Sequence, residues 1–185
     1  MRIFLPLIAA APLALIGCGE SAEQPAAPEM EESSTGAAGE QAVAVLQTAE
    51  GQPAGTATAT VSGDAINLVL AVQNLPAGEH GVHVHMVGAC DAPDFTTAGS
   101  HWNPTGQTHG LEGGAGQHAG DMPNLQVNEQ GTGTLEYTLE GGATFAGLMD
   151  ADGSAFVVHA DTDDQQTDPS GESGGRIACG VFTAG

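Results

Sequence analysis

Six of the seven histidines in this chain have spacings and neighbours that suit metal binding. Two of them form the pair His83-Val84-His85, and an arginine, Arg176, lies near the C-terminus. The remaining ligand candidates are His101, His109, His118, Asp121 and His159. Imidazole nitrogens and carboxylate oxygens are ligands for copper(II) and zinc(II). The set is too large for one four-coordinate ion, and its size predicts two metal ions.

Two of these ligands lie where we expect a β-strand. Side chains at positions i and i+2 of a strand point to the same face, so His83 and His85 can converge on one ion. His159 ends a second predicted strand, residues 156–159, and adds a third ligand if the two strands are neighbours. The His-x-His pair alone is a weak signal, because a strand with exposed polar histidines has the same pattern.

The other candidates lie in a long polar segment, residues 88–124. Three histidines and one aspartate form the closed tetrahedral set that zinc prefers in structural sites. These residues are His101, His109, His118 and Asp121. The alternative is a polar loop that is rich in histidine by coincidence.

From about residue 41 the chain consists of short runs in which apolar and polar residues alternate. Such runs indicate half-buried strands, and Ser62-Gly63-Asp64 between two of them is a hairpin signal. No stretch has a convincing helical period, and 28 glycines disfavour long helices. We therefore expect an all-β fold, a β-sandwich or barrel, with two long functional loops at residues 88–124 and 161–175.

The charge balance argues against two classes of partner. The chain has 2 basic and 23 acidic residues, and its formal charge is −21. Binding to nucleic acid and direct adsorption to an anionic membrane both require a basic surface. We expect neither.

The N-terminus has the pattern of an export signal. Arg2 precedes an apolar run, residues 3–16, that is too short to span a bilayer comfortably. The run ends in Leu15-Ile16-Gly17-Cys18, which resembles a bacterial lipoprotein cleavage box. We expect a signal peptide over residues 1–17 and a lipidated Cys18, with an ordinary secretory signal as the alternative.

The composition of the segment that follows the signal predicts a disordered tether. Residues 18–40 comprise the lipidated cysteine and a disordered linker rich in Glu, Ala, Pro, Ser and Gly, and the domain itself spans residues 41–185. We expect a location in a bacterial cell envelope, held only by the lipid anchor, and Gly19 favours the outer membrane facing the periplasm. In that oxidising compartment Cys90 and Cys179 are one possible disulfide, with two free thiols as the alternative.

Several motifs surround the ligand candidates: Gly81-Val82-His83-Val84-His85, Gly99-Ser100-His101-Trp102-Asn103-Pro104, Thr108-His109-Gly110, His118-Ala119-Gly120-Asp121, Val157-Val158-His159 and Gly174-Gly175-Arg176-Ile177-Ala178-Cys179-Gly180. Together they resemble the signature of copper/zinc superoxide dismutases, in their bacterial exported lipoprotein type. The detailed similarity runs from about residue 75 to residue 182, and residues 163–171 resemble the bacterial branch. It implies an eight-stranded Greek-key β-barrel or sandwich.

The resemblance also implies which residues bind each metal. The copper ligands would be His83, His85, His101 and His159. The zinc ligands would be His101, His109, His118 and Asp121, so that His101 bridges the two ions. Asp163 would orient one ligand of each metal, with Asp164 as the competing candidate by spacing. His80 would be structural and would bind neither metal.

The implied activity is the dismutation of superoxide to dioxygen and hydrogen peroxide at a copper centre bridged to zinc, which would protect the envelope from extracytoplasmic superoxide. His101 would take up and release a proton, and Arg176 would position the superoxide anion. A homodimer is possible, because the family includes monomers and dimers. The rival hypothesis is an exported copper- and zinc-binding protein without significant turnover.

The chain departs from many relatives in the charge of its second long loop. Residues 161–172 carry five acids and no base, which puts long-range electrostatic steering of an anion in doubt. These acids are Asp161, Asp163, Asp164, Asp168 and Glu172.

The lipid anchor leads to a first prediction. Replacing Cys18 by Ser should move the protein from the detergent phase to the aqueous phase in a phase-partition experiment, because the lipidated side chain is lost. Unchanged partitioning would refute the anchor.

Overall fold

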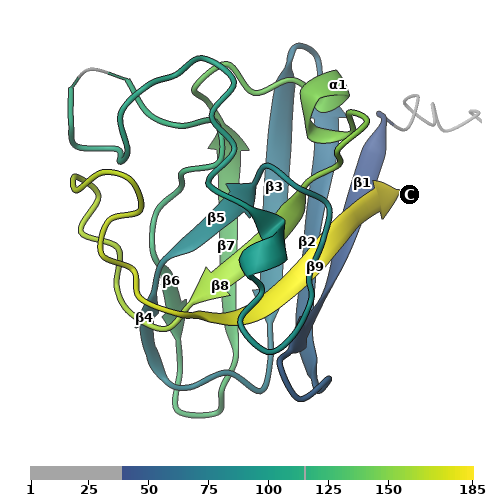
Figure 1. Cartoon of the computed structure of the whole chain (residues 1–185). Coiled ribbons are helices and arrows are strands. Elements are labelled where there is room, and N and C mark those ends of the chain that lie inside the picture. The colour runs from purple at the N-terminus through teal and green to yellow at the C-terminus, as the bar shows by residue number, and fades with distance from the viewer. Residues whose placement is uncertain (1–38, 115) are drawn as a thin grey trace, which may run out of the picture. The chain divides into compact units, whose positions relative to one another are not determined.

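The computed structural model describes residues 39–114 and 116–185 (Figure 1). The predicted signal peptide, Cys18 and all but the last two residues of the predicted linker lie outside the described residues. Within the described part of the chain, no helix is long and apolar enough to cross a membrane.

The described part of the chain contains nine strands, one turn of 3-10 helix and one short α-helix. The strands are β1 (Gln41–Thr48), β2 (Pro53–Ser62), β3 (Ala65–Val72), β4 (Gly78–His80), β5 (Val82–His85), β6 (Leu125–Val127), β7 (Gly133–Leu139), β8 (Ala155–His159) and β9 (Arg176–Ala184). The 3-10 turn covers Thr96–Ala98, and α1 covers Phe145–Leu148.

Alternation of apolar and polar residues produces the long strands. In β3 the side chains of Ile66, Leu68, Leu70 and Val72 are buried, and the residues between them are exposed. The predicted hairpin joins β2 to β3 through the two residues Gly63 and Asp64. Gly63 has a φ of 63°, a left-handed conformation that glycine adopts without strain.

The strands form one large curled sheet and one small sheet. The large sheet has the order β5-β8-β9-β1-β2-β3-β7, and the small sheet pairs β4 with β6. Only Gly81 separates β4 from β5, and the start of β7 packs against the backbone of β6 at Gln126. The small sheet therefore connects the two edges of the large one. The predicted all-β class is confirmed, and the strand number is eight if β4 and β5 count as one interrupted strand.

The core lies inside this curled sheet, and a smaller apolar cluster lies outside it. Phe156 and Phe182 meet edge to face in the main core, with ring centroids 6.5 Å apart. The smaller cluster contains Phe95 and packs around a disulfide between Cys90 and Cys179. The predicted pairing is thus confirmed, and the free-thiol alternative is wrong.

The two long loops are also found where the sequence predicts them. They connect β5 to β6 (residues 86–124) and β8 to β9 (residues 160–175). The disulfide ties the first loop to β9, because Cys90 lies in that loop and Cys179 in the strand. Both loops extend over the same end of the sheet, beside β5 and β8 (Figure 1).

Candidate metal centre

Strand β5 supplies two of the ligand candidates. It pairs with β8 in the register His83↔Val157 and His85↔Ala155. Val82 and Val84, which alternate with the histidines, are buried in the main core. Because successive side chains of a strand point to opposite faces, His83 and His85 share the face that points away from this core.

The ligand-bearing loop pairs with the other edge of β5. Val84 N donates to Gly120 O at 3.0 Å, and Trp102 N donates to Val84 O at 2.8 Å. A Cβ on residue 120 would collide with Val84 O, so only glycine allows this approach. The loop ligands consequently lie beside the strand ligands, in the bridges His83↔Asp121 and His85↔His101.

A β-bulge positions the ligand at the end of β8. The register of β8 and β9 runs from Val158↔Ala178 directly to His159↔Arg176, so Ile177 is an extra residue in β9. A bulge bends the strand and redirects its side chains. It places His159 opposite Arg176.

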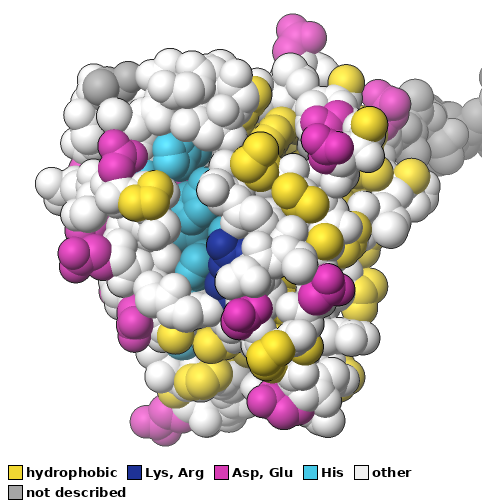
Figure 2. Space-filling model, viewed as in Figure 1, with side chains coloured by type: hydrophobic (Ala, Val, Ile, Leu, Met, Phe, Trp, Pro, Cys, Tyr) yellow, Lys and Arg dark blue, Asp and Glu magenta, His cyan; other side chains and the backbone are white. Residues whose placement is uncertain are grey.

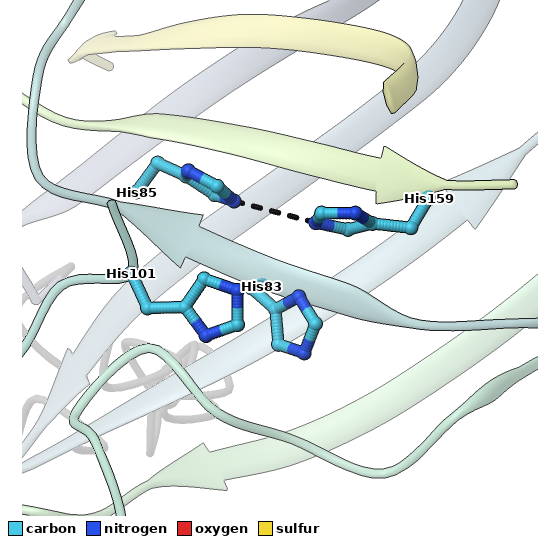
Figure 3. Close-up of side chains that lie close together, drawn as sticks. All are labelled: His83, His85, His101 and His159. Carbon is cyan, nitrogen blue, oxygen red and sulfur yellow. Dashed lines mark hydrogen bonds between the residues drawn. The ribbon is translucent and has the colours of Figure 1, made fainter. Parts of the chain in front are cut away.

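Four histidine rings form a first ligand group, and Figure 3 shows how they lie together. One ligand nitrogen of each ring lies within 4.8 Å of the others, and all four residues are buried. The group consists of His83, His85, His101 and His159. The Nε2 atoms of His85 and His159 face each other at 3.4 Å, the contact drawn as a dashed line in Figure 3.

The protein fixes the opposite nitrogen of these two rings. His85 Nδ1 lies 2.9 Å from Gly99 O, and His159 Nδ1 lies 3.3 Å from Gly174 O. A carbonyl oxygen only accepts hydrogen bonds, so each Nδ1 carries the hydrogen and a neutral ring has a bare Nε2. Two bare nitrogens at 3.4 Å cannot bond to each other. A cation between them satisfies both, and the arrangement therefore fits a metal ion.

The other two rings of this group have bare nitrogens as well. His83 Nδ1 and His101 Nε2 are buried and make no hydrogen bond within the described residues. A buried polar atom without a partner is costly, and metal coordination removes that cost. Each of the four rings thus offers one nitrogen to the same place.

A second ligand group converges on one carboxylate oxygen. Asp121 Oδ1 lies 3.0, 3.1 and 3.2 Å from the Nδ1 atoms of His101, His109 and His118. The other carboxylate oxygen accepts from the backbone N–H groups of Gly110 and His118, which orients Asp121.

By distance alone, His83 competes with His118 for membership of this second group. The hydrogen bonds decide in favour of His118. The Nε2 of His83 is bonded to Asp163, and its one bare nitrogen, Nδ1, is offered to the first group. The Nδ1 of His118 lies 3.2 Å from Asp121 Oδ1, the atom on which the second group converges. Three nitrogens and one carboxylate oxygen match the donor set of zinc.

His101 is common to both groups. Its Nδ1 faces Asp121 in the second group, which leaves its Nε2 for the first group. The ring stacks on His83 with a centroid distance of 3.8 Å. One imidazole therefore has a nitrogen available to each of two neighbouring metal ions.

Asp163 contacts one ring from each group. Its carboxylate lies 2.6 Å from His83 Nε2 and 3.0 Å from His109 Nε2. The competing candidate, Asp164, is exposed and binds Thr167 instead. Of the two carboxylates, only that of Asp163 can orient the ligand rings.

The carboxylates also control the charge of these rings. Burial raises the pKa of Asp163, but its hydrogen bonds to His109 and His83 outweigh burial and hold the pKa well below its usual range. Burial lowers the pKa of His109, but Asp121 and Asp163 outweigh it and raise the pKa to about 9. Burial and charge repulsion from His101 lower the pKa of His159 to about 4.

Arg176 lies beside the first group and is half-buried. Its Nη1 donates to Phe95 O at 2.6 Å, and its Nη2 donates to Gly99 O at 2.7 Å. Gly99 O thus also receives the hydrogen of His85 Nδ1, so one carbonyl connects the guanidinium to a ligand ring. The side chain is the only lysine or arginine among the described residues.

The centre is open to solvent on one side. Figure 2 shows histidine side chains at the surface in a narrow strip, with a basic side chain beside them and an acidic side chain next to the basic one. His101 and His118 line an open hollow of about 420 Å³ with Trp102 and Pro169. Two acids, Asp150 and Asp152, also line this hollow, and His101 is the one residue of the first group that it reaches.

His80 and two residues not singled out from the sequence support the centre. His80 contacts two backbone oxygens, His159 O at 2.8 Å and Pro76 O at 3.0 Å, so neither ring nitrogen is free for a metal. Asn124 binds the backbone N–H and C=O of residue 163 at 2.9 and 2.8 Å. At Gly171 a Cβ would overlap the Asp163 carboxylate. Asparagine and glycine are common in loops, so the sequence holds no specific signal for these two.

Comparison with known proteins agrees with this site. A model of the family described as copper/zinc superoxide dismutase (SODC) matches residues 53–182. The copper-zinc superoxide dismutase of Caulobacter vibrioides is 39% identical over 147 residues, which cover 76% of this chain and 84% of that protein. Superoxide dismutase [Cu-Zn] 1 of Aquifex aeolicus is 38% identical over 138 residues, 71% of this chain and 81% of the relative.

Solved structures show the same fold. A double mutant of a SOD-like protein from Bacillus subtilis matches with a TM-score of 0.68 at 36% identity, over 75% of this chain and 95% of that one. The Cu/Zn superoxide dismutase from Brucella abortus matches with a TM-score of 0.63 at 24% identity, over 78% of this chain and 100% of that one. This match shows a similar fold.

The chain therefore belongs to the copper/zinc superoxide dismutase family. It is an enzyme that uses copper and zinc, and the two histidine-rich groups are the places in the described residues that fit those ions.

The pKa values predict a stability maximum near pH 6.5 for the metal-free protein. The pKa of His109 is about 9 in the folded state and about 6.5 when unfolded, so its contribution is complete below pH 6.5 and is lost as the pH rises through 9. The pKa of His159 is about 4 when folded, so its contribution is present above pH 6.5 and is lost as the pH falls towards 4.

Urea denaturation in the presence of a chelator, from pH 4 to pH 9.5, measures this profile. His109→Gln should flatten the alkaline side of the maximum and leave the acid side in place. A wild-type stability that stays constant between pH 6.5 and pH 9 would contradict the interpretation.

Proposed function

We propose that this protein converts two superoxide anions and two protons to dioxygen and hydrogen peroxide at a copper centre bridged to zinc. The observation that carries this proposal is the position of His101, whose two nitrogens face two different ligand groups. A protein that only stores metals does not need one ring to connect two sites. Superoxide dismutation is the activity in the names of the curated relatives.

The proposed copper ligands are the four rings of the first group, and the proposed zinc ligands are those of the second. The former are His83, His85, His101 and His159, and the latter are His101, His109, His118 and Asp121. The copper set is supported by ring nitrogens that have no hydrogen-bond partner among the described residues or face another bare nitrogen. The zinc set is supported by three Nδ1 atoms that converge on Asp121 Oδ1 within 3.2 Å. The ligands of both groups are largely buried, and the centre meets solvent on one side.

Copper, when bound, supplies the one-electron oxidation and reduction that dismutation requires. The residues around it handle the anion and the protons. Arg176 carries a permanent positive charge beside the first group and attracts the superoxide anion. His101 can hold a proton at Nε2 and deliver it to the reduced oxygen species.

We further propose that the enzyme acts in a bacterial cell envelope, tethered through a lipidated Cys18. Support comes from the apolar run and Cys18 in the sequence, and from the disulfide between Cys90 and Cys179, which suits an oxidising compartment. Protection of the envelope from extracytoplasmic superoxide would follow. Both ligand groups are formed by one chain, so the activity does not depend on the homodimer that the family resemblance allows.

The shared ring leads to a prediction about metal content. His101→Ala should weaken binding of both copper and zinc, because each group loses one of its four ligands. His80→Ala is the matched control, since both nitrogens of His80 face backbone oxygens. It should keep one copper and one zinc per chain even if the protein is less stable. Metal analysis by mass spectrometry in which both variants lose the same metals would overturn the assignment.

The position of Arg176 leads to a prediction about rate. A guanidinium about 5 Å from a bound anion contributes on the order of 3 kcal/mol at an effective dielectric constant near 20, and screening reduces that figure. We expect Arg176→Ala to lower the superoxide dismutation rate at least about tenfold. Arg176→Lys should restore part of the rate through its charge, and Arg176→Glu should be the slowest variant.

The rates must be compared at equal copper and zinc content, because Arg176 also binds two loop carbonyls. Full activity of metal-replete Arg176→Glu would eliminate the proposed anion site. A metal-replete wild-type protein without activity would instead favour the rival function, a copper- and zinc-binding protein without significant turnover.

A further inference from the structure

The loop between β8 and β9 holds His109 at two points. At the ring, the Asp163 carboxylate contacts Nε2 at 3.0 and 3.1 Å. At the backbone, His109 N donates to Asp168 Oδ1 at 2.6 Å. Among the described residues, no hydrogen bond from this loop reaches the other three ligands of the second group. The hydrogen bonds from this loop to the second ligand group are thus concentrated on His109.

A short turn, residues 167–171, presents Asp168 to His109. Gly171 N donates to Thr167 O at 2.7 Å and closes the turn. Asp164 Oδ1 accepts from the backbone N–H groups of Gln166 and Thr167 at 2.9 and 2.8 Å. The exposed Asp164 therefore braces the turn, and the turn fixes where the Asp168 carboxylate lies.

The turn also packs directly on the ligand ring. Gly171 has a φ of 63°, and a Cβ there would overlap the Asp163 carboxylate and lie 2.7 Å from His109 Nε2. The backbone of the turn has no room to move towards His109 unless the ring moves as well. Ring, turn and Asp168 consequently form one rigid contact between the two long loops.

We propose that Asp168 is a positioning residue for the zinc side of the centre. Its carboxylate accepts a charge-assisted hydrogen bond from the His109 backbone, which keeps the ligand-bearing loop in its binding conformation and slows zinc release. The assignment of zinc to the second group rests on the proposed function. Asp168 belongs to neither ligand group and acts only through the backbone of His109.

The effect is specific to one metal because of where the copper-side ligands lie. Three of the four copper-side ligands lie on strands, His83 and His85 on β5 and His159 at the end of β8, so strand pairing holds their backbones. The fourth, His101, lies in the loop but is held to β5 by its own bridge to His85, away from the Asp168 contact. Asp163 differs from Asp168 in this respect, since it binds a ring from each group. Loss of Asp168 should affect zinc alone, and loss of the Asp163 carboxylate should affect both metals.

The test compares zinc release from full-length protein loaded with copper and zinc. Zinc transfer to a chromogenic chelator gives the rate, and mass spectrometry gives the copper that remains. We expect Asp168→Ala to release zinc about tenfold faster or more, with copper retained. Asp168→Asn should lie between this variant and the wild type, because its amide oxygen still accepts the hydrogen bond.

Two control variants separate this effect from others. Glu172→Gln removes a negative charge from the same loop, at an exposed residue with no hydrogen bond to the ligand-bearing loop among the described residues, and should behave as wild type. Asp163→Asn should release both metals faster. The proposal is wrong if Asp168→Ala matches the wild type, if Glu172→Gln releases zinc as fast as Asp168→Ala, or if Asp168→Ala loses both metals together.

Hydrogen exchange of the metal-free protein provides a readout that does not depend on metals. The His109 amide should be protected in the wild type and in Asp168→Asn, and should exchange faster in Asp168→Ala, with strand amides unchanged. Equal His109 exchange in wild type and Asp168→Ala overturns the proposal. Neither measurement uses superoxide, so an inactive protein with normal zinc release would refute the proposed function and leave this inference standing.

Discussion

The buried carboxylate of Asp163 connects the two ligand groups, and much of the site depends on it. It accepts from His83 on a strand and from His109 on a loop. An imidazole has two nitrogens, and a hydrogen bond at one of them leaves the other available to a metal in a fixed direction. The carbonyls of Gly99 and Gly174 act in the same way on the rings of His85 and His159. Backbone and carboxylate oxygens outside the centre thus determine where the bare nitrogens point inside it.

The acids of the second long loop have a structural part in this arrangement. Asp163 orients ligand rings, Asp164 braces a turn, and Asp168 binds the backbone of the neighbouring loop. Three of the five acids therefore help to hold irregular loop backbone, which lacks the regular pairing of a sheet. These negative charges weaken the long-range attraction of an anion, since Arg176 is the only lysine or arginine among the described residues. Its attraction is screened beyond about 10 Å at ordinary ionic strength.

Alternation and motifs predicted the long strands, the hairpin and the two loops, because burial of one sheet face leaves a period of two in the sequence. They did not predict β4 and β6, since three residues are too few to show a period. The family resemblance favoured Asp163, but spacing kept Asp164 as a competitor, because the path of a loop decides which of two neighbours turns inward. No sequence pattern marks the bulge at Ile177, so it could not be predicted, although it places His159 opposite Arg176. The acceptors at Gly99 and Gly174 are backbone atoms, which no side-chain pattern identifies.

The pairing of β5 with the ligand-bearing loop has a consequence for self-association. β5 is the last strand of the large sheet, and an uncovered edge strand can pair with the edge of another molecule. Here the backbone of Val84 is bonded to Gly120 and Trp102, so the loop occupies the edge that another chain would use. The residues that fold the loop onto this edge are flanked by ligands, His101 and Asp121. The same fold of the loop therefore serves two ends: it brings His101 and Asp121 beside β5, and it covers the edge of the sheet.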